Sequence, residues 1–365
     1  IHQANFVACH NPSYVDKYNM VQELVDGGTF LLNCPWDMEG LEKHLPGQVK
    51  AYIANHNIKF YTIDGIKIGK EIGLGGRINT VLQSAFFKLA EIIPEEEAIS
   101  LMKAAAKATY GRKGDKIVQM NYDAIDAGAK QVVEIEVPES WKDAADEGLA
   151  VPHIDENGRK DVIDFVKNIQ TKVNAQEGNS LPVSAFTDYA DGSTPSGSSA
   201  YEKRGIAVDI PIWQPDNCIQ CNRCAYVCPH AVIRPVALTE EEAANAPEGM
   251  QSIPMIGMPD MKFAITVSAY DCTGCGSCAN VCPGKKGEKA LVMGNMEENA
   301  GKQTFFDYGR EIPVKPEVVA KYKETTVKGS QFKQPLLEFS GACAGCGETP
   351  YAKLITQLFG ERMYI

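Results

Sequence analysis

Short apolar runs alternate with helical patterns over the first 137 residues of the chain. The apolar runs predict strands at residues 6–9, 30–34, 58–63 and 132–137. Between the last two runs we expect two helices. One is capped by Asn79 and places its apolar residues on one face, and the other begins at Pro94 with three glutamates in its first turn and ends at Gly111. Strands that alternate with helices predict a parallel-sheet α/β domain.

Changes in the sequence pattern mark the expected domain boundaries. Gly, Ser, Thr and Pro dominate residues 188–201, which indicates a connector. Cysteine becomes frequent after Trp213, and the chain is polar and Lys-rich from Pro313 to Leu336. These changes divide the chain into domains at residues 1–158, 159–204, 205–312 and 313–365.

Two cysteine motifs repeat inside the third of these domains. Each has the spacing Cys-x2-Cys-x2-Cys-x3-Cys followed by Pro, and the second lies 54 residues after the first. The twelve-residue blocks agree at seven positions, which indicates an internal duplication. The gap between them is 43 residues long, and we expect its middle, residues 240–259, to be a surface insertion.

This spacing is typical of two [4Fe–4S] clusters with crossed ligands. Three thiolates of one motif hold one cluster, and its fourth cysteine reaches the other cluster. The predicted ligands are Cys218, Cys221, Cys224 and Cys282 for cluster I, and Cys272, Cys275, Cys278 and Cys228 for cluster II. Zinc also binds four thiolates, but its sites rarely need a third nearby cysteine and a Cys-Pro pair.

Overall composition excludes several classes of protein. The chain has 365 residues, 12 cysteines, 36 Lys+Arg and 47 Asp+Glu, and a formal net charge of −11. An acidic chain without a long basic run does not predict nucleic-acid binding. Because no apolar stretch approaches the ~18 residues of a membrane span and no signal peptide is recognisable, we expect a cytoplasmic protein without a membrane segment. Clustered cysteines in a long chain indicate metal binding rather than disulfides.

A third Cys-x2-Cys, Cys343 and Cys346, stands close to the end of the sequence. Alone it is compatible with half a zinc site, a redox dithiol or half of another cluster. A helix is expected next, capped by Thr349 and with a core-facing stripe of Leu354, Ile355, Leu358 and Phe359. If the pair binds a cluster, two further ligands must come from sequence beyond residue 365, and we therefore interpret the chain as a fragment.

Four blocks of sequence resemble the single-chain pyruvate:ferredoxin (or flavodoxin) oxidoreductases. Residues 31–36, 60–64 and 73–79 resemble the family's third, gamma-type α/β domain, and residues 201–204 (Tyr-Glu-Lys-Arg) its small EKR domain. Residues 218–230 resemble its two-cluster ferredoxin-like domain, and residues 341–350 the opening of its thiamine-diphosphate-binding α/β domain. The resemblance implies a multidomain protein that combines α/β and α+β domains.

Members of this family decarboxylate pyruvate on thiamine diphosphate with Mg²⁺ and transfer the acetyl group to coenzyme A. Electrons pass through three [4Fe–4S] clusters to ferredoxin or flavodoxin. The resemblance implies that Cys343 and Cys346 are ligands of the cluster nearest the thiamine, and that the protein is a homodimer. The thiamine and Mg²⁺ contacts and most of the pyruvate pocket would lie outside this chain, so no catalytic residue is assigned.

The family's third domain also contacts coenzyme A. The candidates for this contact are the polar residues Arg77, Asn79, Gln83 and Asn121, although the residues favour a glycine-rich loop with ordinary helix capping before Asn79 over a phosphate-binding loop. Cys9 and Cys34 have no metal-ligand spacing and are expected to be small buried residues. His230 follows a Cys-Pro pair and is expected to pack beside a cluster; a role as a donor to the cluster and an ordinary surface or satisfied histidine both remain open.

Two other classes of function remain open from sequence. One is a two-cluster ferredoxin-type module that serves a different redox complex, and the other is a zinc-stabilised interaction protein. The block around Cys343 and Cys346 distinguishes the oxidoreductase from the first alternative, because this block has no role in a plain ferredoxin. A colourless sample would indicate zinc. The sequence does not distinguish pyruvate from longer 2-oxoacids.

Overall fold

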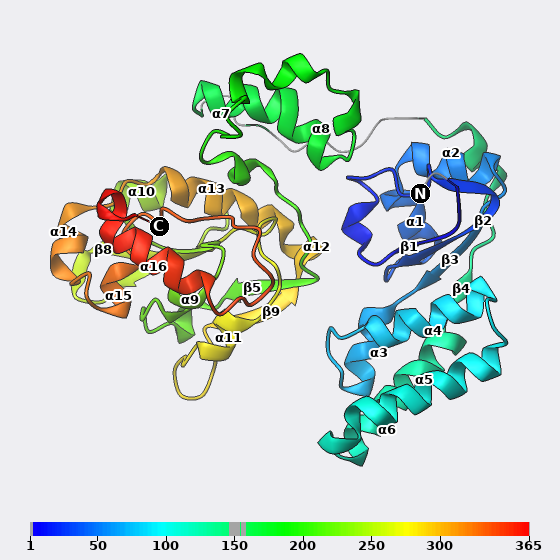
Figure 1. Ribbon diagram of the computed structural model, residues 1–365. Coiled ribbons are helices and arrows are strands. Elements are labelled where there is room, and N and C mark those ends of the chain that lie inside the picture. The colour runs from blue at the N-terminus through cyan, green and yellow to red at the C-terminus, as the bar shows by residue number, and fades with distance from the viewer. Residues whose placement is uncertain (1–2, 146–153, 155–157, 365) are drawn as a thin grey trace. The chain divides into compact units, whose positions relative to one another are not determined.

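The structure is a computed structural model, and it describes residues 3–145, 154 and 158–364. The chain divides into two compact units, Ile1–Val151 (unit 1) and Pro152–Ile365 (unit 2), which run from blue to teal and from green to red in Figure 1. Each unit encloses hydrophobic clusters of its own. Among the described residues, no helix has the length and apolarity that crossing a bilayer requires.

Unit 1 is built on a four-stranded sheet. Its strands lie in the order β1 (Ala4–Cys9), β2 (Leu24–Asn33), β3 (Lys59–Ile63) and β4 (Val133–Glu134). The first three strands are parallel, as the sequence predicts, but β4 runs antiparallel to β3. Both residues of β4 are exposed, so the strand expected at residues 132–137 is a two-residue strand at the edge of the sheet.

Helices cover both faces of this sheet because successive side chains of a strand point to opposite sides. Phe30 and Leu32 pack against two helices on one face, and Leu31 and Ile63 pack against others on the opposite face. The first group is α1 (Met38–His44) and α2 (Gly47–Asn55). The second group is α3 (Gly65–Ile72), α4 (Asn79–Ala90) and α6 (Asp115–Lys130), with α5 (Glu95–Tyr110) packed on α6.

The two helices expected from sequence are α4 and α5. The second follows Pro94 and ends at Gly111, as predicted. Asn79, however, is the first helical residue and not the cap, because the Leu82 N–H already bonds to the carbonyl of Ile78 at 3.0 Å. Close packing of α4 and α6 depends on Gly128, where an added Cβ would lie 2.3 Å from a main-chain oxygen of α4.

Unit 2 begins with a small helical region. It contains α7 (Lys160–Phe165), a π-helical turn (Val166–Gln170) and α8 (Thr171–Asn174), followed by short 3-10 turns. Val162, Phe165 and Ile169 form its buried side. Residues 190–197 contain no helix or strand, but short 3-10 turns (Val183–Tyr189 and Ser198–Tyr201) overlap both ends of the connector expected at 188–201.

The cysteine-rich part of unit 2 contains two antiparallel sheets. One pairs β5 (Asp209–Trp213) with β9 (Leu291–Asn295), and the other has the order β6 (Ile233–Leu238), β8 (Met258–Val267), β7 (Ile253–Met255). The expected surface insertion at residues 240–259 contains α10 (Glu240–Ala244) at the surface, but its second half is not an irregular loop because it forms the β7–β8 hairpin. In that hairpin Pro254, Ile256 and Pro259 are exposed, whereas Met255 is buried and joins the core.

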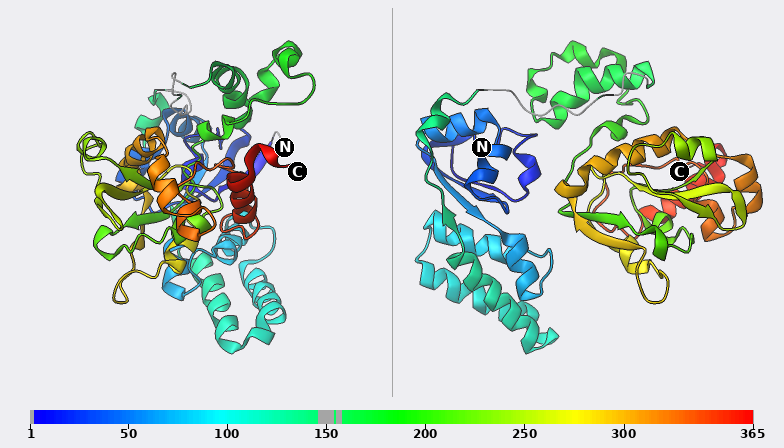
Figure 2. Two further views of the ribbon diagram at one scale, coloured as in Figure 1. Left: turned by 90° about the vertical axis from the view of Figure 1, so that its left-hand side faces the viewer. Right: turned by 180° about the vertical axis from the view of Figure 1, so that it is seen from behind.

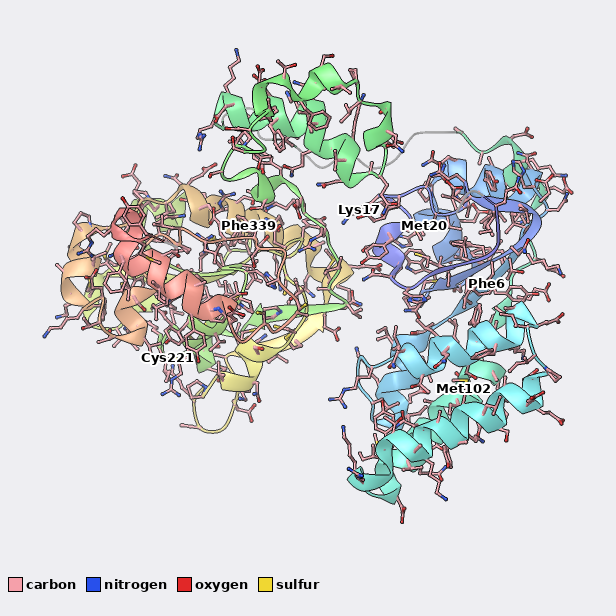
Figure 3. All side chains as sticks on the ribbon, in the orientation of Figure 1. Phe6, Lys17, Met20, Met102, Cys221 and Phe339 are labelled. Carbon is pink, nitrogen blue, oxygen red and sulfur yellow. The ribbon has the colours of Figure 1, made fainter. Side chains whose placement is uncertain are left out.

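The remaining chain wraps around this cysteine-rich part. Its helices are α12 (Met296–Asn299), α13 (Gln303–Glu311), α14 (Pro316–Lys321), α15 (Val327–Ser330) and α16 (Thr349–Phe359). Val318, Phe332 and Phe339 enter the same hydrophobic cluster as the cysteines. Phe339, labelled in Figure 3, lies edge-on to Phe306 of α13 with 6.1 Å between ring centroids. The polar segment therefore packs tightly on the domain that precedes it.

Candidate metal centre

The two cysteine motifs fold into the same loop. Gln220 and Gly274 occupy equivalent positions with φ of 55° and 67°, and Asn222 and Gly276 do so with φ of 57° and 73°. A short helix follows each loop, α9 (Arg223–Val227) and α11 (Ser277–Val281), and the two helices contact each other. The sequence duplication is thus a structural duplication, although only the second loop uses glycine where the backbone is left-handed.

Buried side-chain amides fix the first loop in this conformation. Gln220 donates to the carbonyl of Pro254 and accepts from the N–H of Ile256, both at 2.8 Å. Asn222 donates to the carbonyl of Lys328 in α15 at 2.9 Å. Both amides are almost fully buried, with exposed fractions of 1% and 2%. These bonds attach the loop to the β7–β8 hairpin and to α15, a role that no sequence motif reveals.

Backbone N–H groups point at the cysteine sulfurs. The first cysteine of each loop, Cys218 or Cys272, accepts from the N–H two residues later at 3.4 Å. Cys282 accepts from the N–H of Ala290 at 3.3 Å. Such hydrogen bonds to cluster thiolates raise the reduction potential of a cluster.

All four predicted ligands of cluster I surround one cavity. Cys218, Cys221 and Cys224 line it together with Cys282 of the second motif, and the space measures about 360 Å³ including the part open to solvent. Cys221 is labelled in Figure 3. The indole Nε1 of Trp213, which also lines the cavity, is buried without a nitrogen or oxygen partner and lowers the pKa of Cys218. An indole donor that faces the Cys218 sulfur fits a sulfur-ligated cluster in this space.

The predicted ligands of cluster II also approach one another across the repeat. Burial raises the pKa of Cys278 to about 12 and that of Cys272 further still, and a charge on Cys228 raises both. Cys228, from the first motif, therefore lies beside the thiols of the second. A charge on Cys278 likewise raises the pKa of Cys224, and the contact between α9 and α11 makes the two sets of ligands neighbours.

Buried thiols of this kind require a cation to ionise. Burial raises the pKa of Cys218 and Cys224, and neighbouring thiolates raise it further. Metal binding supplies the missing positive charge and releases the protons. Across the described residues, no three His, Cys, Asp or Glu side chains are placed to hold a single ion. Zinc would need all its sulfurs about 2.3 Å from one centre, whereas a cubane presents a separate iron to each thiolate.

The third cysteine pair lies against the second loop. A Cβ at Gly345 would be 3.4 Å from Cβ of Cys275. Cys343 is exposed, and Cys346 accepts from the hydroxyl of Thr349 at 3.1 Å, which lowers the pKa of its thiol. The prediction that Thr349 caps the following helix is wrong. Glu348 occupies that position, and the Thr349 hydroxyl serves the sulfur instead.

Helix α16 buries the opposite face from the one expected. Leu354 and Leu358 are only half-buried and Ile355 and Phe359 are exposed, so the prediction of a core-facing apolar stripe is wrong. The buried residues are Thr349, Lys353 and Gln357.

The ammonium of Lys353 explains this orientation. It donates to the main-chain carbonyls of Ala225 and, at 3.0 Å, Cys228 at the end of α9. Burial lowers its pKa to about 8. The side chain thus ties α16 to the first cysteine motif, with α9 and α16 in contact in unit 2 (Figure 1).

His230 is buried close to these cysteines. Its Nδ1 lies 3.0 Å from the carbonyl oxygen of Ser340, and its Nε2 has no partner among the described residues. Burial lowers the pKa of the ring, so the neutral imidazole is favoured. The histidine therefore joins the first motif to the segment that leads to the third cysteine pair.

Three of the four candidate coenzyme A residues line one cavity in unit 1. Arg77, Asn79 and Gln83 surround it at the start of α4, facing His10 beyond the end of β1. Asn121 does not line this cavity. It is buried in α6 and donates to the carbonyl of Ile117 at 2.8 Å. Cys9 and Cys34 are buried as expected, and burial raises the pKa of each thiol to about 12.

Three family models match successive parts of the chain. Residues 1–131 match pyruvate ferredoxin/flavodoxin oxidoreductase, residues 153–207 match EKR, a domain of unknown function, and residues 217–286 match a 4Fe-4S dicluster domain. The third match contains both cysteine loops. The chain therefore combines a region of this oxidoreductase family with an EKR region and a two-cluster iron–sulfur domain, in the order that the sequence resemblance implies.

Relatives identify the family more closely. The chain is 49% identical to a pyruvate-flavodoxin oxidoreductase of Enterobacter agglomerans and 50% identical to a pyruvate:ferredoxin oxidoreductase of Moorella thermoacetica, in both cases over 100% of this chain and 30% of the relative. It is 45% identical to a pyruvate dehydrogenase [NADP(+)] of Cryptosporidium parvum, over 100% of this chain and 20% of that protein. The chain belongs to the pyruvate:ferredoxin/flavodoxin oxidoreductase family and spans about a third of the length of the first two relatives.

Proposed function

We propose that this chain is the electron-transfer segment of an enzyme that oxidatively decarboxylates pyruvate to acetyl-CoA and CO2. The observation that carries the proposal is the arrangement of ten cysteines in three adjacent loops, two of which exchange their fourth residue. Clusters I and II would be held by the two crossed sets of four cysteines, and a third cluster in part by Cys343 and Cys346. When bound, the clusters would supply one-electron chemistry.

The position of the third pair supports an order for the electron path. Its Gly345 lies against Cys275, a proposed ligand of cluster II, while cluster I is bounded by the first loop. Electrons from the thiamine side would therefore enter cluster II from the third cluster and leave through cluster I. Contact between α9 and α11 keeps the two sets of ligands close enough for transfer.

Iron content tests the ligand assignment. In the intact, anaerobically isolated protein we expect about twelve irons per chain with matching acid-labile sulfide, as three cubanes require. Cys224→Ser and Cys278→Ser should each lower the iron content by disrupting one cubane, and Cys343→Ser should disrupt the third. Cys9→Ala is the matched control because Cys9 is buried away from the motifs, and it should leave the iron content unchanged. About eight irons in the wild-type protein, without bound thiamine diphosphate, would indicate a two-cluster module instead.

The cavity at the start of α4 is a candidate coenzyme A site. Arg77 supplies a positive charge beside the N-terminus of a twelve-residue helix, and both favour a phosphate group. We expect Arg77→Ala to weaken coenzyme A binding by at least tenfold in calorimetric titrations of the intact protein. Arg112→Ala, at an exposed arginine that does not line the cavity, should bind normally. Equal affinity in both variants would remove this assignment.

The surface around cluster I fits an acidic carrier such as a ferredoxin or flavodoxin. Arg223 lines the cavity, and Lys328 is close enough to Cys218 and Cys221 for their thiolates to raise its pKa against the lowering by burial. Lys285 is exposed, follows the lining residues Pro283 and Gly284, and donates to the carbonyl of Asp216 at 2.9 Å. Cations near the exit attract an anionic partner and align it for transfer.

Reversing charge on this rim tests the docking surface. Lys285→Glu should slow pyruvate-dependent reduction of the carrier at low salt and should leave reduction of a small neutral dye unchanged. Lys116→Glu, an exposed lysine of unit 1, is the matched control. Equal rates for both variants would contradict docking at cluster I.

The same preparation tests the expected homodimer: light scattering should give the mass of two copies of the intact protein.

A further inference from the structure

Lys353 is unusual among the charged side chains of unit 2. It is 1% exposed and is the one charged residue among the largest fully buried side chains of the described chain. Its ammonium contacts two main-chain carbonyls, and no carboxylate lies within ion-pair distance among the described residues. Arg234, also buried in unit 2, has such a partner in Glu338. An unpaired buried ammonium is costly unless another negative charge compensates it.

The nearest negative charges belong to the proposed cluster ligands. The ammonium of Lys353 donates to the main-chain oxygens of Cys228 and of Ala225, the residue that follows Cys224. Cys224 is a proposed ligand of cluster I, and Cys228 of cluster II. Lys353 therefore stands where the two sets of ligands meet, on a helix that follows the third cysteine pair.

We propose that Lys353 is a fixed cation shared by clusters I and II, which raises the reduction potential of both. The inference rests on the ligand assignment of the proposed function. A thiolate-ligated cubane carries net negative charge, and each added electron increases that charge. A buried cation nearby stabilises the reduced form more than the oxidised form, and low dielectric surroundings strengthen the effect. Because one cation acts on both clusters, it shifts both potentials in the same direction.

Helix α16 would thus have two roles at once. Thr349 at its first turn donates to Cys346 of the third pair, and Lys353, one turn later, supplies the shared cation. Gln357, on the same buried face, donates to the carbonyl of Lys333 at 2.6 Å and fastens the helix without adding charge. The helix that supports the third cysteine pair therefore also sets the electrostatics of the other two.

Removing and restoring this charge tests the proposal. Potentiometric titrations of the intact, cluster-loaded protein, followed by electron paramagnetic resonance, report the midpoint of each cluster. In Lys353→Met we expect both midpoints to become more negative, with the reduced-to-oxidised ratio at the wild-type midpoint falling at least about tenfold, or about 59 mV for a one-electron couple. Lys353→Arg should keep the wild-type midpoints, and so should Gln357→Leu, which removes a buried hydrogen bond of α16 but no charge.

A second variant covers the case in which Lys353→Met loses its clusters. Gln357→Glu keeps the lysine and places a carboxylate one turn away on the same buried face, where it would neutralise the ammonium and shift both midpoints in the negative direction. Unchanged midpoints in a fully loaded Lys353→Met or Gln357→Glu protein would overturn the inference, as would an equal shift in Lys353→Arg or Gln357→Leu. A wild-type protein with too little iron for two cubanes would instead overturn the ligand assignment, and the inference with it.

Discussion

Replacing Gln220 by alanine should release one cluster and spare the other. The change removes two hydrogen bonds of 2.8 Å that hold the first loop to the β7–β8 hairpin. At about 0.5–1.5 kcal/mol each, their loss amounts to about 2 kcal/mol, or about thirtyfold in the equilibrium between closed and open loop. In an anaerobic chelation assay of the intact protein, the irons of cluster I should leave about thirtyfold faster than in the wild type, because the chelator reaches them through the open loop.

A second glutamine separates the hydrogen bonds from the backbone effect. Gln176 also has a left-handed backbone, with φ of 65°, but its side chain is exposed. Alanine imposes similar backbone strain at both positions, so Gln176→Ala should leave iron release unchanged. If Gln220→Ala releases all its irons at the wild-type rate, or releases those of both clusters equally fast, the reasoning about the first loop is wrong.

Three further predictions concern packing, pH and thiol reactivity. Gly128→Ala should lower the free energy of unfolding of unit 1 by about 1–3 kcal/mol in thermal denaturation because its Cβ collides with α4, whereas Gly111→Ala, with open space around it, should be neutral or slightly stabilising. Because the pKa values of the Cys9 and Cys34 thiols are raised from 9 to about 12, the folded state keeps protons that the unfolded state has lost, so their contribution to stability should fall between about pH 9 and 12. A double alanine variant should show a flatter pH profile of chemical denaturation, and an identical slope would contradict this. In the cluster-free protein, Thr349→Val should slow alkylation of Cys346, because the hydroxyl that lowers the pKa of this thiol is gone. An unchanged rate of alkylation would refute this role of the hydroxyl.

Cysteine spacing carried most of the information about the candidate site. The spacing alone predicts that Cys282 joins the first motif, and the cavity brings it to Cys218, Cys221 and Cys224. The left-handed backbone at Gly274 and Gly276 can also be predicted from the sequence, because glycine adopts this conformation readily. At the equivalent Gln220 and Asn222 they are not, because the side-chain bonds that permit this backbone come from residues far along the chain.

Helix α16 shows why pattern alone failed elsewhere. Its apolar stripe predicts that Ile355 and Phe359 face the core, but Lys353 finds carbonyl partners at the end of α9 and turns that stripe outward. A long-range partner, invisible in a local pattern, decided the orientation. Asn121 illustrates the same limit in unit 1. Its polarity made it a candidate for ligand binding, yet a carbonyl within its own helix already satisfies it.

The exchange of Cys228 and Cys282 between the two motifs has a consequence for biosynthesis. Cys282 leaves the ribosome about sixty residues after Cys224, which at about 5–20 residues per second is a delay of about 3–12 s. During that interval cluster I has only three of its four proposed ligands, because Cys228 of the same motif belongs to cluster II. Delivery of iron and sulfide during translation would therefore find an unfinished acceptor, so the scaffold proteins that supply both clusters should act on the released chain.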